Sequence, residues 1–170
     1  MANIDRGGRA RRVVISWVLT ILGILVITYV AGRLRAPDLP DTAPVFTARL
    51  LTGEAFELEA LEGQSVVLNF WATWCGPCQF EIPAFSRFAA RHPEIAVLGV
   101  VAPEPRARIV AAVRDLEIDY PVVLGTAEIL DAYGVTTFPT TVFVGPDGRI
   151  QTAHGGLMLD PQLEFAGLGL

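Results

Sequence analysis

Apolar and polar residues follow a pattern that separates an N-terminal span from a folded domain. Residues 13–32 carry no charged side chain, and at about 1.5 Å per residue a helix of this length crosses a ~30 Å hydrocarbon layer. From residue 45 onward, short apolar runs typical of buried strands alternate with stretches in which apolar residues recur at helical spacing. This order predicts an α/β domain with parallel strands joined by right-handed crossovers.

The centre of the predicted sheet is the run of residues 66–71, which is nearly all apolar, as expected of a strand covered on both faces. A predicted helix at 77–91 and a second apolar run at 95–101 complete a βαβ unit. The other predicted elements are a hairpin of residues 45–51 and 55–58, a helix near 109–116, a strand at 121–124, a helix at 127–133, strands at 141–144 and 149–153, and a closing helix at 160–167.

The N-terminal segments predict a membrane anchor and its orientation. Four arginines precede the uncharged span and two follow it closely, so the positive-inside rule places the N-terminus in the cytoplasm. A cleaved signal peptide is the alternative, but its apolar region usually has about 7–15 residues, and Tyr29-Val30-Ala31 is a poor cleavage site. We therefore expect a cytoplasmic tail (1–12), a transmembrane anchor (13–32), a proline-rich linker (33–44) and a single domain (45–170).

Net charge divides the chain in the same way. Residues 1–12 hold four arginines and one acidic residue, for a net charge of +3, whereas residues 33–170 hold nine arginines and 17 acidic residues, for a net charge of −8. Nucleic-acid binding depends on basic side chains that neutralise phosphates. The acidic domain is therefore expected to have no nucleic-acid partner.

The two cysteines of the chain form the motif Cys75-Gly76-Pro77-Cys78, where the predicted strand at 66–71 leads into the predicted helix. The N–H groups and the macrodipole at a helix N-terminus favour the thiolate form of Cys75 and lower its pKa from about 8.5. Cys78, one turn further on, is expected to be more buried and to resolve a mixed disulfide. Pro77 suits the first helical turn, and Gly76 lets a partner chain approach Cys75 closely.

Other roles for the cysteine pair fit the sequence less well. A zinc site needs about four ligands, and the remaining candidates, His92 and His154, stand at no ligand-like spacing from Cys75. A structural disulfide usually closes a long loop, whereas this one would close a short loop and stabilise the fold little. We interpret His92 as a cation at a helix end and His154 as an exposed loop residue. Redox chemistry is thus favoured, and we expect no metal and no cofactor.

The sequence NFWATWCGPC of residues 69–78 resembles the active site of thioredoxin-fold proteins. More narrowly, it resembles that of the membrane-anchored TlpA/ResA/DsbE-like thiol-disulfide oxidoreductases of bacteria, and the resemblance covers about residues 40–160. It implies a thioredoxin-like fold with an N-terminal β-hairpin and a central strand–helix insertion, preceded here by one transmembrane helix.

The resemblance also implies roles for individual residues. Glu81 matches an acidic position near the site and is expected to manage the proton of Cys78, with an ordinary solvated helix residue as the alternative. Pro139 is expected to be a cis-proline that faces the cysteines, Phe138 to offer its main chain to an extended peptide, and Trp74 to shape a docking surface. The expected catalytic residues are Cys75, Cys78 and Glu81, and the expected substrate-binding residues are Trp74, Gly76, Pro77, Phe138 and Pro139.

Together these features predict reduction of disulfides in exported proteins, by a protein held at the bacterial inner membrane. The resemblance favours apocytochrome c as the substrate, in cytochrome c maturation; a copper-site protein of the respiratory chain and a broad set of exported thiols are the alternatives. A membrane thiol transporter of the CcdA or DsbD type would supply the electrons.

Three other activities are less consistent with the motif. A disulfide oxidase of the DsbA type has a basic residue between its cysteines, whereas Gly-Pro resembles reducing thioredoxin, so we expect a potential below about −200 mV. A peroxiredoxin-like peroxidase needs a proline- and threonine-framed cysteine with an activating arginine, and the run before Cys75 holds no proline or arginine. A copper-binding module would need a third ligand, for which His154 is the candidate.

Overall fold

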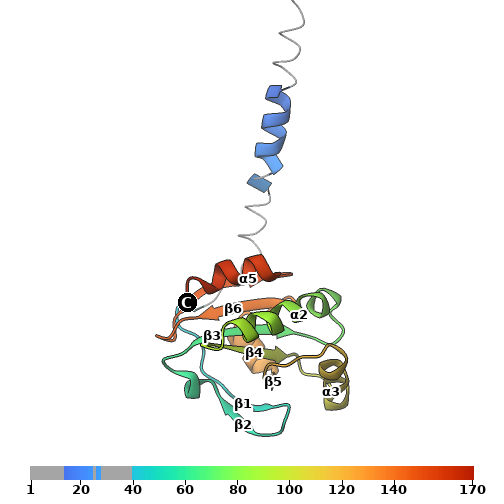
Figure 1. The fold of residues 1–170 in the computed structure, drawn as a ribbon, viewed down its shortest axis with the longest axis vertical. Coiled ribbons are helices and arrows are strands. Elements are labelled where there is room, and N and C mark those ends of the chain that lie inside the picture. The colour runs from blue at the N-terminus through green and yellow to red at the C-terminus, as the bar shows by residue number, and fades with distance from the viewer. Residues whose placement is uncertain (1–13, 25, 28–39) are drawn as a thin grey trace, which may run out of the picture. The chain divides into compact units, whose positions relative to one another are not determined.

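The computed structural model describes residues 14–24, 26–27 and 40–170 (Figure 1). The chain divides into two units, residues 1–36 and 37–170. In the first unit, residues 14–24 and 26–27 are helical, and none of the helices among the described residues has the length and apolar character needed to cross a membrane. The predicted anchor of residues 13–32 lies only partly within the described residues, and the predicted tail and most of the predicted linker lie outside them.

The described part of the second unit is built on one seven-stranded sheet, in the order β2-β1-β5-β4-β3-β6-β7. β3, β4 and β5 are mutually parallel, whereas β6 runs antiparallel to β3 and β1 runs antiparallel to β5. The strands are β1 (Thr47–Leu50), β2 (Ala55–Glu57), β3 (Ser65–Trp71), β4 (Ile95–Val101), β5 (Val122–Leu124), β6 (Thr140–Val144) and β7 (Ile150–Gly155). The helices of this unit are η1, a 3-10 turn (Leu58–Leu61), α2 (Gly76–Arg91), α3 (Arg106–Asp115), α4 (Ala127–Ala132) and α5 (Asp160–Gly167).

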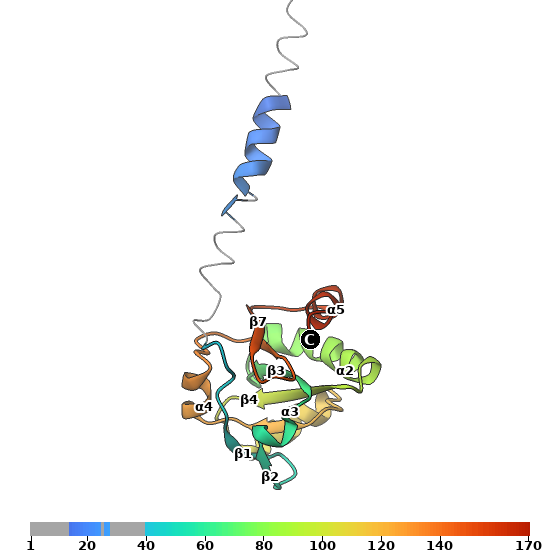
Figure 2. The ribbon, with the colours of Figure 1, turned by 90° about the vertical axis from the view of Figure 1, so that its left-hand side faces the viewer.

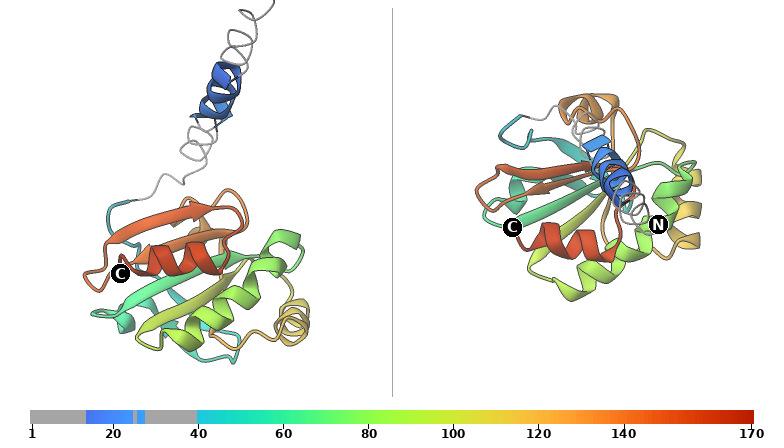
Figure 3. Two further views of the ribbon diagram at one scale, coloured as in Figure 1. Left: turned by 45° about the horizontal axis from the view of Figure 1, so that its top comes forward. Right: turned by 90° about the horizontal axis from the view of Figure 1, so that it is seen from above.

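Both faces of the sheet are covered, which explains why β3 is almost entirely apolar. Side chains alternate along a strand, so Leu68 packs with Ile129 of α4 on one face, and Val67 packs with Phe85 of α2 on the other. Figure 2 shows α4 and α2 on opposite sides of the sheet. α5 lies beside α2 (Figure 3) and carries Leu163 into the same apolar cluster as Phe85.

The register of the parallel strands determines where the functional loops lie. Trp71, the last residue of β3, is paired with Val101, the last residue of β4. The chain therefore leaves both strands at the same edge of the sheet, where the Ala102 N–H donates to the Trp71 carbonyl over 2.8 Å. The loops that lead into α2 and α3 start side by side at this edge.

The predicted elements of residues 45–170 are confirmed, with small differences at their ends. The helix predicted near residues 109–116 is α3, which begins at Arg106, earlier than its apolar pattern indicates. His154 lies in β7 and not in an exposed loop, so that expectation was wrong; its pairing with Thr141 continues the ladder with β6. The chain also joins the domain before residue 45, since Ala43 is buried and its N–H donates to the Gly148 carbonyl over 2.9 Å.

Candidate redox site

Cys75 and Cys78 form a disulfide at the N-terminus of α2. Cys75 is the N-cap residue, and its sulfur accepts a hydrogen bond from the Cys78 N–H over 3.2 Å. Cys75 is 5 % exposed and Cys78 is fully buried, so the expectation that Cys78 is the more buried of the two is confirmed. After reduction, the same N–H groups and the positive end of the helix dipole would stabilise a thiolate on Cys75.

Glu81 lies on the buried face of α2, one turn after Cys78, and its side chain is fully buried. Its carboxylate accepts hydrogen bonds from Asn69 Nδ2 (2.7 Å) and from the Met158 main-chain N–H (2.8 Å). Burial raises the pKa of Glu81 to about 7, and the two hydrogen bonds oppose that rise. Because its side chain is buried, the alternative interpretation of Glu81 as a solvated helix residue is wrong.

A carboxyl group in this position can exchange a proton with Cys78. Residues three apart on a helix are neighbours on its surface, so Glu81 and Cys78 face the sheet together. Because the pKa of Glu81 is about 7, both its protonated and its ionised forms are populated at neutral pH. The group is therefore suited to accept a proton in one step and return it in another.

The predicted docking residues Trp74, Gly76 and Phe138 lie near Cys75. Trp74 is 65 % exposed, and its ring meets that of Phe138 edge-on, with the ring centroids 5.8 Å apart. Phe138 also packs against the apolar cluster that contains both cysteines, and the Phe138–Pro139 peptide bond is cis, as predicted. Gly76 borders open space, because a Cβ atom built on it would meet no other atom within 4 Å. These residues are thus brought together at one edge of the sheet, and their role in docking stays a prediction.

Several contacts of the site were not foreseen from the sequence. Met158 reaches Glu81 through its main chain, so its side-chain type carries no signal for this contact. Thr73 donates to the carboxylate of Glu104, a residue on a different loop, and accepts a hydrogen bond from Gln79. Glu104 stands between Pro103 and Pro105, a pattern that is typical of a loop but does not indicate a partner.

His92 lies at the C-terminal end of α2, whereas the cysteines lie at its N-terminal end. His92 follows the last residue of α2, and its ring contacts the carboxylates of Glu94 (3.2 Å) and Glu164 (2.9 Å). The carboxylate of Glu164 is the main reason that the pKa of His92 is raised. This agrees with the interpretation of His92 as a helix-end cation. Within residues 40–170, no three side chains of His, Cys, Asp or Glu come together as a metal site would require.

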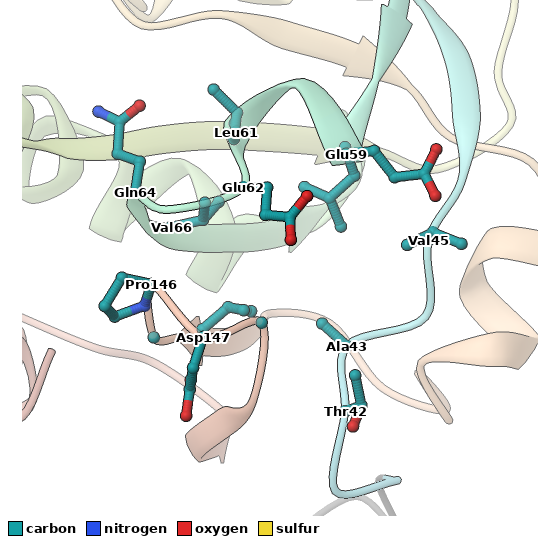
Figure 4. Close-up of a pocket in the computed structure, with 14 residues that line it drawn as sticks. Thr42, Ala43, Val45, Glu59, Leu61, Glu62, Gln64, Val66, Pro146 and Asp147 are labelled. Carbon is teal, nitrogen blue, oxygen red and sulfur yellow. The ribbon is translucent and has the colours of Figure 1, made fainter.

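A cavity of about 250 Å³ lies at the other end of the sheet (Figure 4). It borders Val66 at the start of β3 and the turn that follows β6, and acidic side chains such as Glu59 and Glu62 stand at its rim. Because Cys75 follows the opposite end of β3, this cavity is separate from the redox site.

Comparison with known proteins places this geometry in a family. Residues 39–153 match the model of the AhpC/TSA family. The chain belongs to this family. It is 34 % identical over 127 residues to the thiol-disulfide oxidoreductase ResA of Halalkalibacterium halodurans, covering 73 % of this chain and 72 % of ResA. It is 31 % identical over 160 residues to the thioredoxin-like protein YneN of Bacillus subtilis, covering 87 % of this chain and 94 % of YneN.

Solved structures show the same fold. The structure of MTB dsbF superposes with a TM-score of 0.69 at 31 % identity, covering 75 % of this chain and 96 % of dsbF. StoA from Bacillus subtilis superposes with a TM-score of 0.65 at 28 % identity, covering 75 % of this chain and 99 % of StoA. The second unit therefore has a thioredoxin-like fold, and the chain is a thiol-disulfide oxidoreductase of the ResA and DsbE type with a Cys75–Cys78 redox pair.

Proposed function

We propose that the protein reduces disulfides in exported proteins outside the cytoplasm, held at the bacterial inner membrane by residues 13–32. The observation that carries the proposed chemistry is the redox pair at the start of α2 with a buried carboxyl group, Glu81, one helical turn from Cys78. Support for the anchor and its orientation comes from the sequence: an uncharged span of 20 residues with most of the nearby arginines before it.

In the first step, the thiolate of reduced Cys75 attacks one sulfur of a target disulfide. A new S–S bond joins Cys75 to the target, the target's own S–S bond breaks, and the second target sulfur leaves as a thiolate. Trp74 and Phe138 would contact the target beside the attacked sulfur, and Gly76 leaves room for its main chain.

In the second step, Cys78 loses its proton to the Glu81 carboxylate, and its thiolate attacks the Cys75 sulfur. The mixed disulfide breaks, and the first target sulfur leaves as a thiolate. The target has then gained two electrons, and the protein holds the Cys75–Cys78 disulfide seen in the structure. Glu81 returns its proton when a dithiol donor reduces this disulfide again. By resemblance, the donor is a membrane thiol transporter of the CcdA or DsbD type.

We infer that the main substrate is an apocytochrome c, whose paired thiols must be reduced before haem attachment. The basis for this inference is the resemblance of residues 69–78 to the TlpA/ResA/DsbE-like proteins. A substrate of this kind offers a disulfide between two closely spaced cysteines in an extended segment. The open surface at Gly76 and the exposed ring of Trp74 are compatible with such a segment.

A trapping experiment tests this function in the native host. In the variant Cys78→Ser the resolving thiol is absent, so targets should stay linked to Cys75 and be released by a reductant for identification by mass spectrometry. We expect a protein with a C-x-x-C-H haem site to be enriched. The double variant Cys75→Ser/Cys78→Ser is the matched control and should capture nothing.

Each outcome of the trap decides a separate part of the proposal. Capture of a copper-site protein, or of many exported proteins, would keep the reductase chemistry but refute the assignment to cytochrome c maturation. If Cys78→Ser captures nothing while the wild-type protein reduces its targets, the two-cysteine mechanism is wrong. The potential of the pair should lie below about −200 mV, and a value near −120 mV would instead identify an oxidase.

A further inference from the structure

The turn that presents Cys75 is held from two sides. The Cys75 N–H donates to the Ala72 carbonyl over 3.1 Å, which closes a turn with Thr73 and Trp74 at its centre. On one side of this turn, the side-chain amide of Gln79, in the first turn of α2, donates to the Thr73 carbonyl over 2.7 Å. On the other side, Thr73 is bound by a residue from outside the motif.

That residue is Glu104, in the loop between β4 and α3. Its carboxylate accepts two hydrogen bonds from Thr73, one from the main-chain N–H (2.8 Å) and one from the hydroxyl (2.5 Å). Thr73 is buried, and the Glu104 side chain is only 6 % exposed. All three hydrogen-bonding groups of Thr73 are therefore occupied, two of them by one carboxylate.

The sheet explains why Glu104 reaches this turn. Trp71 and Val101 are the last residues of two paired parallel strands. Thr73 comes two residues after Trp71, and Glu104 comes three residues after Val101, so both lie at the same edge of the sheet. Prolines stand on both sides of Glu104, and each fixes the φ angle of its own residue. The loop thus holds the carboxylate in a restricted position beside the turn.

Burial of a carboxylate destabilises the folded state unless a partner compensates its negative charge. For Glu104, a cation provides only weak compensation. Among the described residues, the cation that pairs with Glu104 is Arg108, whose guanidinium lies 3.9 Å away and whose side chain is 64 % exposed. The close contacts of Glu104 are those with Thr73. The arrangement is therefore a carboxylate bound to a turn, and an ion pair contributes little to it.

We propose that Glu104 is a positioning residue for the redox pair, which acts by holding Thr73 and, through it, the turn that presents Trp74 and Cys75. This proposal rests on the proposed reductase function and adds to it a residue of the β4–α3 loop. The N-terminus of α2 stabilises the thiolate of Cys75 only while the sulfur stays at the N-cap position. A released turn would let that sulfur move away from the N–H groups and would also move Trp74 from its contact with Phe138.

The variant Thr73→Val tests this proposal because it removes the hydroxyl contact and preserves the shape of the side chain and the charge of Glu104. We expect the midpoint pH for alkylation of Cys75 by iodoacetamide to rise by about 0.5 unit in the reduced full-length protein. We expect the rate constant for reduction of insulin disulfides at pH 7 to fall about tenfold, because displacement of a reacting group by about 1 Å strongly lowers the reaction rate. Thr73→Ser keeps the hydroxyl and should restore both values.

Two further variants separate positioning from a general loss of stability. Thr152→Val makes the same chemical change at an exposed position of β7 and should behave as the wild type. Glu104→Gln can accept only one of the two hydrogen bonds and should lower the reduction rate in the same direction as Thr73→Val. Because both residues act through one contact, the double variant Thr73→Val/Glu104→Gln should be no more than about twofold slower than the slower single variant.

The proposal is overturned if Thr73→Val keeps the wild-type alkylation midpoint and reduction rate, or if the effects of the two single variants multiply in the double variant. Thermal unfolding of each variant, monitored by circular dichroism, verifies that the compared proteins are folded. A failure of the proposed function would give a different result: the wild type itself would not reduce insulin, while the alkylation midpoints would still report on the turn.

Discussion

Replacing Glu81 with glutamine should remove a specific part of the pH dependence of stability. Burial raises the pKa of Glu81 from its ordinary value of 4.5 to about 7. At 1.36 kcal/mol per pH unit, this difference corresponds to about 3 kcal/mol of folding free energy. The side chain is fully buried, so solvent does not screen the effect.

The sign of the effect follows from the protonation of the two states. Between pH 4.5 and about 7, Glu81 keeps its proton in the folded protein and loses it in the unfolded chain. The folded state then binds more protons, so the free energy of unfolding falls as the pH rises through this range. The contribution of Glu81 is complete below pH 4.5, and the loss reaches its full size above about pH 7.

Urea unfolding of the oxidised wild type and of Glu81→Gln, measured from pH 4 to pH 8, tests this reasoning. We expect the difference in unfolding free energy between the two proteins to shift by about 3 kcal/mol in favour of the variant over this range. Groups such as His92 and Asp160, whose pKa values are also shifted, titrate in both proteins and cancel in the difference. Glu62→Gln, at an exposed position, is the control.

The variant should also carry an offset that does not depend on pH. A glutamine side chain can accept from only one of the two donors, Asn69 Nδ2 and the Met158 N–H, which leaves the other donor short of a partner at a cost of about 1–3 kcal/mol. The two effects are separable because only the first changes between pH 4 and pH 8. Parallel stability curves for Glu81→Gln and the wild type would refute the assignment of a raised pKa to Glu81.

Two further predictions concern packing and docking. Gly125→Ala should lower the free energy of unfolding in urea by about 1–3 kcal/mol, because the added Cβ atom would lie 2.6 Å from the main-chain oxygen of Val101. An unchanged unfolding midpoint would contradict this packing. Trp74→Ala should raise the KM for a protein disulfide several-fold and should leave the reduction of a small linear disulfide such as 2-hydroxyethyl disulfide within about twofold of the wild type. Equal losses on both substrates would argue against a docking role.

Much of the domain could be predicted because its signals are local. The apolar run of β3 and the helical spacing of α2 gave both elements to within a residue or so at their ends. Cys75 was correctly expected at the helix N-terminus, and Pro139 was correctly expected to follow a cis bond. For β3, α2 and Cys75 the decisive information lies within a few neighbouring residues of the sequence, whereas the cis bond before Pro139 was implied by the resemblance to the TlpA/ResA/DsbE-like proteins.

The contacts that complete the site depend on residues far apart in the chain. Glu104 meets Thr73 because two parallel strands end together, a register that no local pattern specifies. Met158 contributes a main-chain N–H, which every residue except proline possesses. The buried carboxylate of Glu81 is bound by Asn69 of β3 and by Met158, which precedes α5, so its exposure could not be decided from the spacing on α2 alone.

The spread of the site along the sequence affects when it can form during folding. Asn69 is paired in the sheet with Thr141, and the hydrogen bond from Met158 to Glu81 spans 77 positions. Contacts between residues so distant in sequence form late and slowly, because a long loop must first be closed. An incomplete chain that ends before β6 therefore carries the two cysteines and Glu81 without the strand that pairs with Asn69 and without the Met158 N–H that binds Glu81. Selective thiol exchange becomes available only when almost the whole domain has been synthesised and folded.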